Sequence, residues 1–341
     1  MSDNLTVLLS FPVPRSTSNP YNVMLERSLR RQPGMTCLNF RWRTAILGRY
    51  DVFHAHWPEI LVSGNGPLKK LVRQALFVLF LGRLAMTRTP IVRTVHNIEL
   101  PRGISRREVL LLHWLDRVTS LRIVLNPTTP VPAGSASATI PLGHYRDWYA
   151  SQVPNEPVPG RLGYFGMVRG YKGVESLVTA FRGTRELAEG LTLRIGGRPS
   201  SDELARRIEQ LARGDDRIRV EFGFLPDAAL VELATSSELV VMPYRFMHNS
   251  SGTITALSLD RPVLVPDNLV NRLLAEEVGP GWVFRYPGDL TATAIVDAIA
   301  QLRASTRSAR PDLSARGWES AAARHLQAYR AAIALRRAPG S

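Results

Sequence analysis

Short runs of apolar and β-branched residues alternate with longer segments of helical periodicity along nearly the whole chain. Strands in the first half are predicted at 5–11, 36–40, 51–56, 91–96 and 122–125. Helices are predicted between them, at 20–32, 67–87 and 104–119. This alternation favours a parallel sheet whose strands are joined by right-handed crossovers. Residues 1–150 are therefore expected to form a doubly wound α/β domain.

The same alternation begins again after 151–160, a stretch rich in proline and polar residues that is typical of a linker. Further strands are predicted at 161–168, 191–197, 218–224, 239–244 and 262–267. Further helices are predicted at 172–188, 200–213, 226–235 and 252–259. We expect a second Rossmann-like domain at 161–317, with a ligand cleft where the two domains face each other, because open α/β sheets bind ligands beyond the carboxyl ends of their strands. A helical tail at 318–338 could pack back on the first domain.

The composition fits two globular domains. The chain has 341 residues, of which 45% are hydrophobic and 21% charged, and this excludes global disorder. The single cysteine, Cys37, allows no disulfide within the chain and fits a reducing cytoplasm. Neither a signal peptide nor a transmembrane helix is expected. Residues 68–86 are the segment most similar to a transmembrane helix. They are expected to form either a helix packed in its domain or a basic amphipathic face that lies on the inner surface of the plasma membrane.

The chain is strongly basic, with a formal net charge of +14 that comes almost entirely from arginine. Such a surface attracts phosphate, whether on nucleotides, nucleic acid or anionic lipid. The arginines are spread along the chain, and no zinc-finger, RRM or KH signature occurs. A nucleic-acid-binding protein is therefore the weaker alternative, and no nucleic-acid partner is expected.

GYFGMVRGYKG (163–173) is the first candidate phosphate site. Gly166 permits a tight turn after a predicted strand, and Arg169 and Lys172 precede the start of a helix. A helix N-terminus beside two cations suits the diphosphate of a nucleotide. The pattern is neither G-x-x-x-x-G-K-[ST] nor G-x-G-x-x-G, which disfavours a P-loop enzyme and a dinucleotide-dependent dehydrogenase. The alternative interpretation is a glycine turn with two surface cations.

PYRFMHNSSGT (243–253) is the second candidate, because a polar loop joins the end of a strand to the start of a helix. Free backbone N–H groups at such a start can bind phosphate, although simple helix capping would use the same residues. Phe224, in VEFGF (220–224), could stack on a nucleotide base or belong to the core. The residues assigned to the nucleotide on this side are Phe224, Tyr244, Asn249, Ser250, Ser251, Gly252 and Thr253.

Together these motifs resemble the donor domain of GT-B-fold glycosyltransferases. The resemblance includes G-x-x-R-x-x-K-G (166–173), FGFLPD (222–227) and PY…SG…ALS…RPVLVP (243–266), and in the first half TVHN (94–97) and PLGHYRDWY (141–149). HWPE, TVHN, GHY and SSGT…ALS are most similar to the group that includes bacterial glycolipid β-1,4-mannosyltransferases of exopolysaccharide assembly. The resemblance implies transfer of a hexose from a sugar nucleotide, with GDP-mannose as the leading donor, to a hydroxyl of a glycan or lipid-linked glycan.

One departure from that family bears on the mechanism. Many retaining members carry two glutamates, for the donor sugar and the ribose, at the positions where this chain has Met247 and Thr255. Their replacement favours an inverting mechanism, which needs a general base from the first domain. The alternatives are a retaining transferase that uses a UDP-sugar or other sugar nucleotide, and a degenerate transferase that acts as a scaffold.

Polar and aromatic residues in HAHWPEI (54–60) supply the candidate bases. Glu59 is the first choice, because a carboxylate in a dry cleft can have a raised pKa, and His56 and His96 come next. A structural salt bridge for Glu59, and buried hydrogen-bonded histidines at His54 and His96, are the alternatives. No D-x-D, H-E-x-x-H or cysteine pair occurs, so no metal or other cofactor is expected beside the nucleotide sugar.

The long polar loop FPVPRSTSNPYNVML (11–25) is expected to reach the same cleft and hold the acceptor. An ordinary capped loop between a strand and a helix is the alternative. The residues assigned to the acceptor are Arg15, Ser16, Asn19, Asn22, Trp57 and His144.

Overall fold

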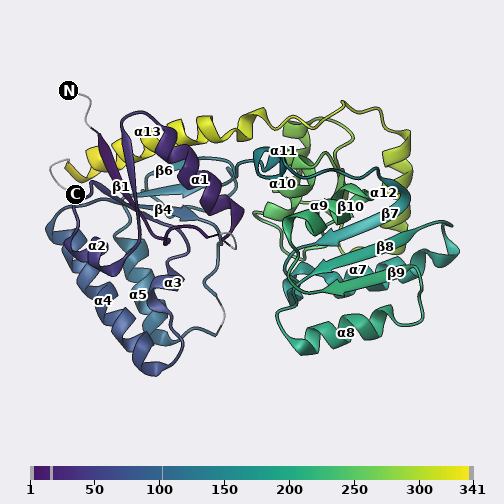
Figure 1. Cartoon of the computed structure of the whole chain (residues 1–341), viewed down its shortest axis with the longest axis horizontal. Coiled ribbons are helices and arrows are strands. Elements are labelled where there is room, and N and C mark those ends of the chain that lie inside the picture. The colour runs from purple at the N-terminus through teal and green to yellow at the C-terminus, as the bar shows by residue number, and fades with distance from the viewer. Residues whose placement is uncertain (1–3, 16–17, 102, 338–341) are drawn as a thin grey trace. The chain divides into compact units, whose positions relative to one another are not determined.

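The computed structural model of the chain describes residues 4–15, 18–101 and 103–337 (Figure 1). Its contacts divide it into two compact units, Met1–Gly143 with Arg316–Ser341 and His144–Ala315. Each unit holds one six-stranded sheet in which every recorded strand pair is parallel. The α/β class with two parallel sheets is as predicted.

The sheet of the first unit has the order β2-β1-β3-β4-β5-β6. Its strands are β1 (Leu5–Leu9), β2 (Met35–Asn39), β3 (Val52–Ala55), β4 (Ile91–Val95), β5 (Leu121–Val124) and β6 (Ser137–Thr139). In the sheet β1 lies between β2 and β3, so the chain adds β2 on one side of β1 and all later strands on the other. The order therefore reverses between β1 and β3, and this position is the topological switch point of the unit.

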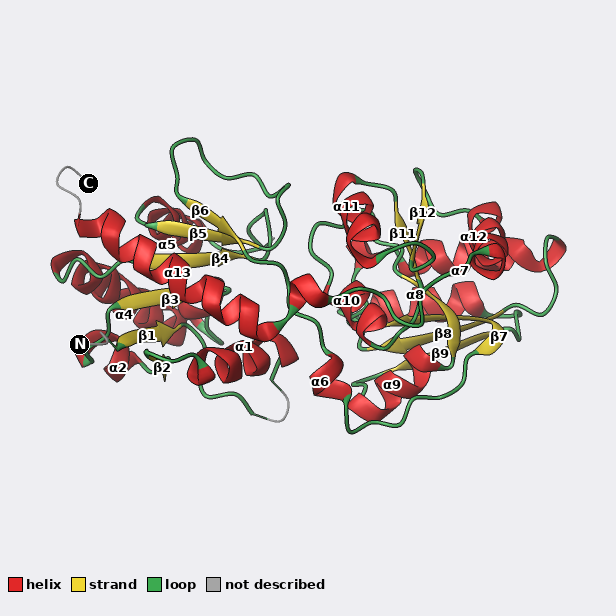
Figure 2. Ribbon diagram, turned by 90° about the horizontal axis from the view of Figure 1, so that it is seen from above, coloured by secondary structure: helices red, strands yellow, loops and turns green. Residues whose placement is uncertain are grey.

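Helices cover both faces of this sheet (Figure 1). They are α1 (Pro20–Arg31), α2 (Trp42–Leu47), α3 (Glu59–Val62), α4 (Pro67–Met86), α5 (Arg106–Arg117) and α13 (Trp318–Arg337). α13 packs on α1, β4 and β5, and Figure 2 shows it crossing the strands. The opposite face buries an aromatic cluster that contains Phe53, Phe77 and Phe80, each fully buried. Burial of each such ring stabilises the unit by about 1.5–3 kcal/mol.

The sheet of the second unit has the order β12-β11-β10-β7-β8-β9. Its strands are β7 (Val158–Phe165), β8 (Thr192–Gly197), β9 (Ile218–Phe222), β10 (Ser237–Val241), β11 (Val263–Pro266) and β12 (Val283–Tyr286). Counted from β7, this is the Rossmann order 3-2-1-4-5-6. The switch point lies between β7 and β10.

The helices of the second unit begin with the short α6 (Arg146–Tyr149) and also lie on both faces of its sheet. α7 packs on α8 and α12, whereas α9 packs on β7, β8 and β10. The remaining bounds are α7 (Val174–Arg182), α8 (Asp202–Ala212), α9 (Asp227–Thr235), α10 (Ser251–Ser258), α11 (Leu269–Val278) and α12 (Ala292–Ala304), with 3-10 turns at Gly170–Lys172, Gly183–Glu186 and Ser314–Arg316.

The expected linker at 151–160 is wrong in part, because β7 already begins at Val158. Pro159 and Gly160 lie at a register shift between β7 and β10, and a bulge is one of the few places where a sheet tolerates proline. The Glu238 carboxylate accepts a hydrogen bond from the Gly160 N–H there. The contacts also place residues 144–150 in the second unit and 316–317 in the first, unlike the domain bounds expected from the sequence.

Candidate functional site

Most of the candidate residues lie at the carboxyl ends of the strands that flank each switch point, whereas His96 follows β4 and Phe224 follows β9. In the first unit, residues 10–19 follow β1 and residues 56–58 follow β3. In the second unit, residues 166–173 follow β7 and residues 242–250 follow β10. Open α/β sheets bind ligands at these positions, because neighbouring loops diverge there and leave a crevice. Each unit therefore presents one candidate binding region.

The loop after β7 turns through Gly166 and a 3-10 turn, Gly170–Lys172, before α7 begins. Gly173 ends that turn with φ 68°, in the left-handed region. A Cβ at this position would lie 2.0 Å from the Pro243 carbonyl oxygen, so the glycine lets this loop approach the loop after β10. The Arg245 N–H donates to the Tyr171 carbonyl at 3.1 Å and joins the same two loops.

Lys172 and Tyr244 face each other between these loops. The Lys172 ammonium lies 4.9 Å from the centroid of the Tyr244 ring. No carboxylate within the described residues forms an ion pair with Lys172, and burial, opposed by Tyr171, lowers the pKa of its ammonium. A partly buried cation without a carboxylate partner is stabilised when an anion binds beside it.

The start of α10 lies beside this cation. Ser250 is the N-cap, and its Oγ accepts from the Thr253 N–H at 3.1 Å and from the Thr253 hydroxyl at 3.0 Å. The Tyr244 hydroxyl hydrogen-bonds the Ser250 side chain, and burial raises the pKa of that phenol to about 12. Gly252 leaves room for Tyr244, because a Cβ there would lie 3.4 Å from its Oη. The structure thus brings together Lys172, Tyr244, Ser250, Gly252 and Thr253.

The other predicted donor residues lie around this group. Arg169 precedes the 3-10 turn and is exposed. Asn249 is part-buried directly before the N-cap, and Ser251 is the exposed first residue of α10. Phe224 follows β9 at the edge of the sheet, and its side chain is 72% exposed. Phe224 can contact the nucleotide base only if the bound nucleotide extends from β7 across β8 to β9. Met247 and Thr255, at the positions of the family's glutamates, are both buried.

The first unit places a series of hydrogen-bonded histidines at the carboxyl ends of β3 and β4, with His54 in β3, His56 just after it and His96 just after β4. His56 Nδ1 lies 3.1 Å from His96 Nε2, and His56 Nε2 lies 3.2 Å from His54 Nδ1. His54 and His56 are buried, whereas His96 is part-buried. Burial, followed by the neighbouring histidines, holds the pKa of His54 and of His56 well below the usual range, and burial and Arg93 lower that of His96 to about 3. All three rings are therefore neutral near pH 7.

Two further aromatic rings surround these histidines. Trp57 stacks on His96 with ring centroids 3.7 Å apart and planes 14° apart. The Trp57 backbone has φ 43°, an uncommon conformation for a residue with a side chain, which turns the chain out of β3 and aims the indole at His96. Tyr21 in α1 meets the His56 and His96 rings edge-on, at 5.9 and 5.2 Å.

Glu59 begins the short helix α3 and is part-buried. Burial raises the pKa of its carboxyl group, opposed by a backbone hydrogen bond and by Arg93. The direction of this shift is the one expected for a carboxylate general base. Glu59 and His56 thus follow β3, whereas His96 follows β4.

The predicted acceptor residues of the loop after β1 have mixed placements. Arg15 is exposed, Asn19 caps α1 by accepting from the Tyr21 N–H at 3.0 Å, and Ser16 lies outside the described residues. Asn22 is in the first turn of α1, and its Oδ1 is buried without a hydrogen-bond partner among the described residues. That oxygen can accept a hydrogen bond from a ligand hydroxyl. His144, expected in the first domain, lies in the second unit, because the Tyr145 N–H donates to Ser258 Oγ in α10 at 2.9 Å.

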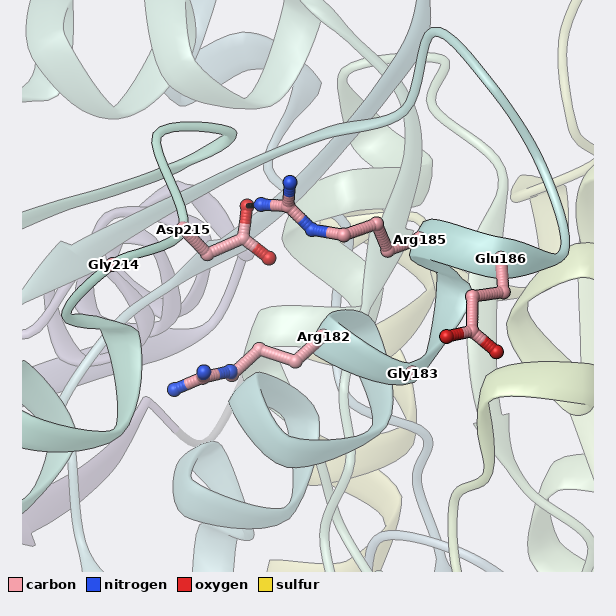
Figure 3. A pocket seen from close by; sticks show the side chains of 6 residues that line it. All are labelled: Arg182, Gly183, Arg185, Glu186, Gly214 and Asp215. Carbon is pink, nitrogen blue, oxygen red and sulfur yellow. Dashed lines mark hydrogen bonds and ion pairs between the residues drawn. The ribbon is translucent and has the colours of Figure 1, made fainter.

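Two cavities lie away from these loops. One of about 290 Å³ is lined by Arg182, Gly183, Arg185, Glu186, Gly214 and Asp215 (Figure 3). These residues precede β8 and β9, at the amino ends of the strands, and Arg185 and Arg217 pair with the Asp215 carboxylate. The other, of about 380 Å³, lies between the starts of α4 and α5 in the first unit. Within residues 4–15, 18–101 and 103–337, no group of three or more His, Cys, Asp or Glu side chains is arranged to hold a metal ion.

Sequence reasoning missed two residues of this site, both from α13. The Tyr329 Oη lies 2.7 Å from His54 Nδ1, and the ring of His325 lies 5.6 Å from that of His54. Both are buried residues of a helix about 270 positions further along the chain. No local signal could have assigned them, although a histidine and a tyrosine four residues apart share one helix face.

Sequence similarity to known proteins identifies the family of this chain. No protein-family model matches the chain. It is 40% identical over 331 residues to a protein of Xanthomonas campestris pv. campestris named GDP-mannose:glycolipid 4-beta-D-mannosyltransferase, with 96% of this chain and 93% of that protein covered. The chain belongs to this glycosyltransferase family. A second Xanthomonas campestris sequence of the same name has the same identity and coverage. The family resemblance predicted from the motifs is thus confirmed over nearly the whole chain.

Solved structures of other proteins share the fold of this chain. AviGT4, a glycosyltransferase involved in avilamycin A biosynthesis, has a TM-score of 0.61 at 17% identity, with 97% of this chain and 98% of that chain covered. Sucrose-phosphate synthase of Thermosynechococcus elongatus has a TM-score of 0.57 at 16% identity, covering 97% and 96%. HepE of Anabaena, in complex with UDP and glucose, has a TM-score of 0.58 at 15% identity, covering 93% and 94%. The predicted GT-B fold is confirmed.

Proposed function

We propose that this glycosyltransferase moves mannose from GDP-mannose to a hydroxyl of a glycolipid, with inversion at the anomeric carbon and without a metal ion. The 40% identity to GDP-mannose:glycolipid 4-beta-D-mannosyltransferase over 96% of the chain supports the donor and the acceptor class. The second unit supplies the donor site and the first unit supplies the acceptor site and the base.

The donor diphosphate is held by the loops after β7 and β10. Lys172, which lacks a carboxylate partner among the described residues, pairs with the phosphate, and Arg169 adds a second cation. The Ser251 and Gly252 N–H groups at the start of α10 donate to the same oxygens, since the first N–H groups of a helix have no partner within it and that of Thr253 already donates to Ser250 Oγ. As the sugar leaves, negative charge grows on the diphosphate, and these groups stabilise it in place of a metal ion. A nucleoside diphosphate needs no general acid to leave.

Inversion follows from a single displacement. The acceptor oxygen forms a bond to the anomeric carbon while the bond from that carbon to the GDP oxygen breaks, and the hydroxyl proton passes to a base of the first unit. Glu59, His56 and His96 are the candidate bases. Buried Met247 and Thr255, in place of the two glutamates of many retaining members, support inversion over retention.

The surface of α4 supports attachment to an anionic membrane, at the inner face of the plasma membrane. No helix among the described residues is long and apolar enough to cross a bilayer. Leu68, Leu71, Val72 and Leu79 nevertheless form an exposed apolar stripe along α4. The basic residues Lys69, Lys70 and Arg73 of the same helix accompany this stripe. Lys70 lines the 380 Å³ cavity together with Ser105, Arg106 and Arg107. An apolar stripe with cations at its margin suits anionic headgroups above acyl chains.

Titration calorimetry with GDP, UDP and their sugars tests the donor assignment. The proposal expects GDP and GDP-mannose to bind more tightly than UDP and UDP-glucose to the wild-type protein, and EDTA to leave the affinity unchanged. Tighter binding of UDP-glucose would favour the retaining alternative with a UDP-sugar. Strict dependence on a divalent cation would refute metal independence.

A further inference from the structure

Three imidazoles and two hydroxyls form one continuous hydrogen-bonded chain inside the first unit. His96 Nε2 meets His56 Nδ1 at 3.1 Å, and His56 Nε2 meets His54 Nδ1 at 3.2 Å. The far end of the chain is closed by two hydroxyls, because His54 Nε2 lies 2.8 Å from Thr94 Oγ1 and His54 Nδ1 lies 2.7 Å from Tyr329 Oη. The near end, His96, is part-buried and stacked on Trp57.

A neutral imidazole carries one hydrogen, so the links between the rings must all point the same way. In one direction every Nε2 carries the hydrogen, and His96 donates to His56, which donates to His54. In this direction Nδ1 of His96 is a proton acceptor. In the opposite direction every Nδ1 carries the hydrogen, and His96 cannot accept a proton there.

We propose that His96, His56 and His54 relay the proton of the acceptor hydroxyl, and that Tyr329 is the positioning residue that completes the relay at its buried end. The relay rests on the proposed function, which supplies the hydroxyl that loses its proton. His96 Nδ1 takes that proton, and the hydrogen on His96 Nε2 passes to His56 Nδ1. The hydrogen on His56 Nε2 then passes to His54 Nδ1, so one proton enters at His96 and one positive charge rests on His54.

The two hydroxyls at the end of the chain suit this outcome. Protonated His54 carries hydrogens on both nitrogens and needs two acceptors, which are Thr94 Oγ1 and Tyr329 Oη. A hydroxyl rotates between donating and accepting, so the same two oxygens serve neutral and charged His54. Hydrogen bonds from a charged donor are stronger than those from a neutral one. Tyr329 therefore contributes most when the relay holds its extra proton.

Burial opposes any charge at this place, and no carboxylate side chain among the described residues hydrogen-bonds to His54 or His56. A single protonated ring would bear the full cost of burying a positive charge. For this reason burial lowers the pKa of each of the three rings. Transfer along the chain moves the charge from the part-exposed end to the ring with two hydroxyl acceptors. The titratable and charged groups that face the three rings are Tyr21, Arg93, His325 and Tyr329. Glu59 interacts with Arg93, and Cys37 with Tyr329.

His325 supplies an internal reference for the tautomers. Its Nδ1 lies 2.7 Å from the Ala321 carbonyl oxygen, which can only accept, so neutral His325 carries its hydrogen on Nδ1. Its buried Nε2 has no partner among the described residues. The relay therefore requires Nε2–H tautomers at His54, His56 and His96 beside an Nδ1–H tautomer at His325.

Long-range ¹H–¹⁵N NMR of the wild-type full chain reads these tautomers directly and needs neither donor nor acceptor. Three Nε2–H rings at neutral pH are expected. A hydrogen on Nδ1 of His54, His56 or His96 overturns the relay, because the chain would then point the wrong way. The tautomers measured by NMR do not depend on the proposed function. That function is tested by a different result, because it is wrong if the wild-type protein transfers no mannose from GDP-mannose.

Kinetics of Tyr329→Phe test the positioning role, with Tyr50→Phe as the matched control. Tyr50 is also a buried tyrosine of the first unit, and its hydroxyl donates to the Ala45 carbonyl at 2.6 Å. Tyr329→Phe is expected to lose about 10-fold in kcat with an unchanged KM for the donor, the rate equivalent of one hydrogen bond. Tyr50→Phe is expected to keep the wild-type kcat. An unchanged kcat in Tyr329→Phe, or an equal loss in both variants, overturns the role.

Glu59→Gln and His96→Gln separate the relay from a carboxylate base. If His96 takes the proton, His96→Gln is expected to lower kcat about 100-fold or more, which is the usual contribution of a general base. Glu59→Gln is expected to lose less than His96→Gln. A loss confined to Glu59→Gln overturns the relay and leaves the proposed function standing. If Tyr329→Phe fails to fold, the NMR tautomers of the wild-type protein and this pair decide the proposal.

Discussion

His54 Nδ1 and Tyr329 Oη lie 2.7 Å apart, although 275 residues separate them in the sequence. The contact joins strand β3 to the last helix, α13, inside the first unit. α13 packs on α1, β4 and β5 of the first unit (Figure 2). The end of the chain therefore builds part of the region to which we assign the acceptor and the base.

The buried histidines predict a stability that falls in mild acid. His54, His56 and His325 have folded-state pKa values below the usual 6.5, because of burial first, and that of His325 is lowered to about 4. Below pH 6.5 the unfolded chain takes up protons that the folded chain does not, so stability present above pH 6.5 is lost as the pH falls towards 4. Each histidine contributes about 1.4 kcal/mol per pH unit.

Urea unfolding at pH 7, 6 and 5 measures this loss. His325→Leu removes one titrating group and should reduce the slope of the unfolding free energy against pH by about 1.4 kcal/mol per pH unit. An unfolding free energy that stays constant between pH 7 and pH 5 would show that the histidines are not buried as neutral rings.

Gly173→Ala is expected to destabilise the second unit and weaken nucleotide binding. The residue has φ 68°, and an added Cβ would lie 2.0 Å from the Pro243 carbonyl oxygen. We expect a loss of about 2 kcal/mol or more in the free energy of unfolding. Gly170→Ala, in the same 3-10 turn, is the control, because its Cβ would have no neighbour within 4 Å and should change stability by no more than about 0.5 kcal/mol. Equal melting temperatures for the two variants would contradict the close approach of the loops.

Lys172→Met is expected to weaken GDP binding and to leave the free protein at least as stable as wild type. Loss of a charged hydrogen bond to phosphate costs about 10-fold or more in affinity. The free protein loses only a partly buried cation that has no carboxylate partner among the described residues. Calorimetry for GDP and thermal unfolding without nucleotide measure the two effects. Lys69→Met, in the first unit, should leave GDP affinity unchanged, and a wild-type Kd in Lys172→Met would remove the cation from the donor site.

The double variant Leu71→Ser and Val72→Ser is expected to detach the protein from anionic vesicles. The two side chains belong to the exposed stripe of α4, and loss of their apolar area should weaken binding about 10-fold or more. Co-sedimentation with phosphatidylglycerol vesicles measures this, with phosphatidylcholine vesicles to isolate the electrostatic part. Leu187→Ser in the second unit is the control, since Leu187 and Leu71 are both 52% exposed. Equal sedimentation of all variants would argue against this surface.

The sequence predicted the elements of the fold well, because apolar periodicity reports burial directly. The expected helix at 67–87 is Pro67–Met86, and the expected strand at 91–96 is Ile91–Val95. α2 and α3 were missed, since helices of six and four residues are too short to show a period. Pro159 suggested a linker where the structure has a bulged strand. Composition alone does not separate these two cases.

The candidate site was predictable where its residues follow a strand or begin a helix. Lys172 and Ser250 were found in this way, because glycine turns and N-cap residues leave a local pattern. Tyr329 and His325 were not, because their role depends on how α13 packs against β4 and β5. His144 was assigned to the wrong unit, because the pattern of strands does not reveal which core an irregular segment joins.

The proposed reaction is an inverting transfer of mannose from GDP-mannose to a lipid-linked glycan. NMR of the purified product, after incubation of the wild-type protein with GDP-α-mannose and such an acceptor, reads the anomeric configuration of the new bond. We expect a β-mannosyl product that forms in the presence of EDTA. An α-mannosyl product, or transfer from UDP-glucose with none from GDP-mannose, would contradict it.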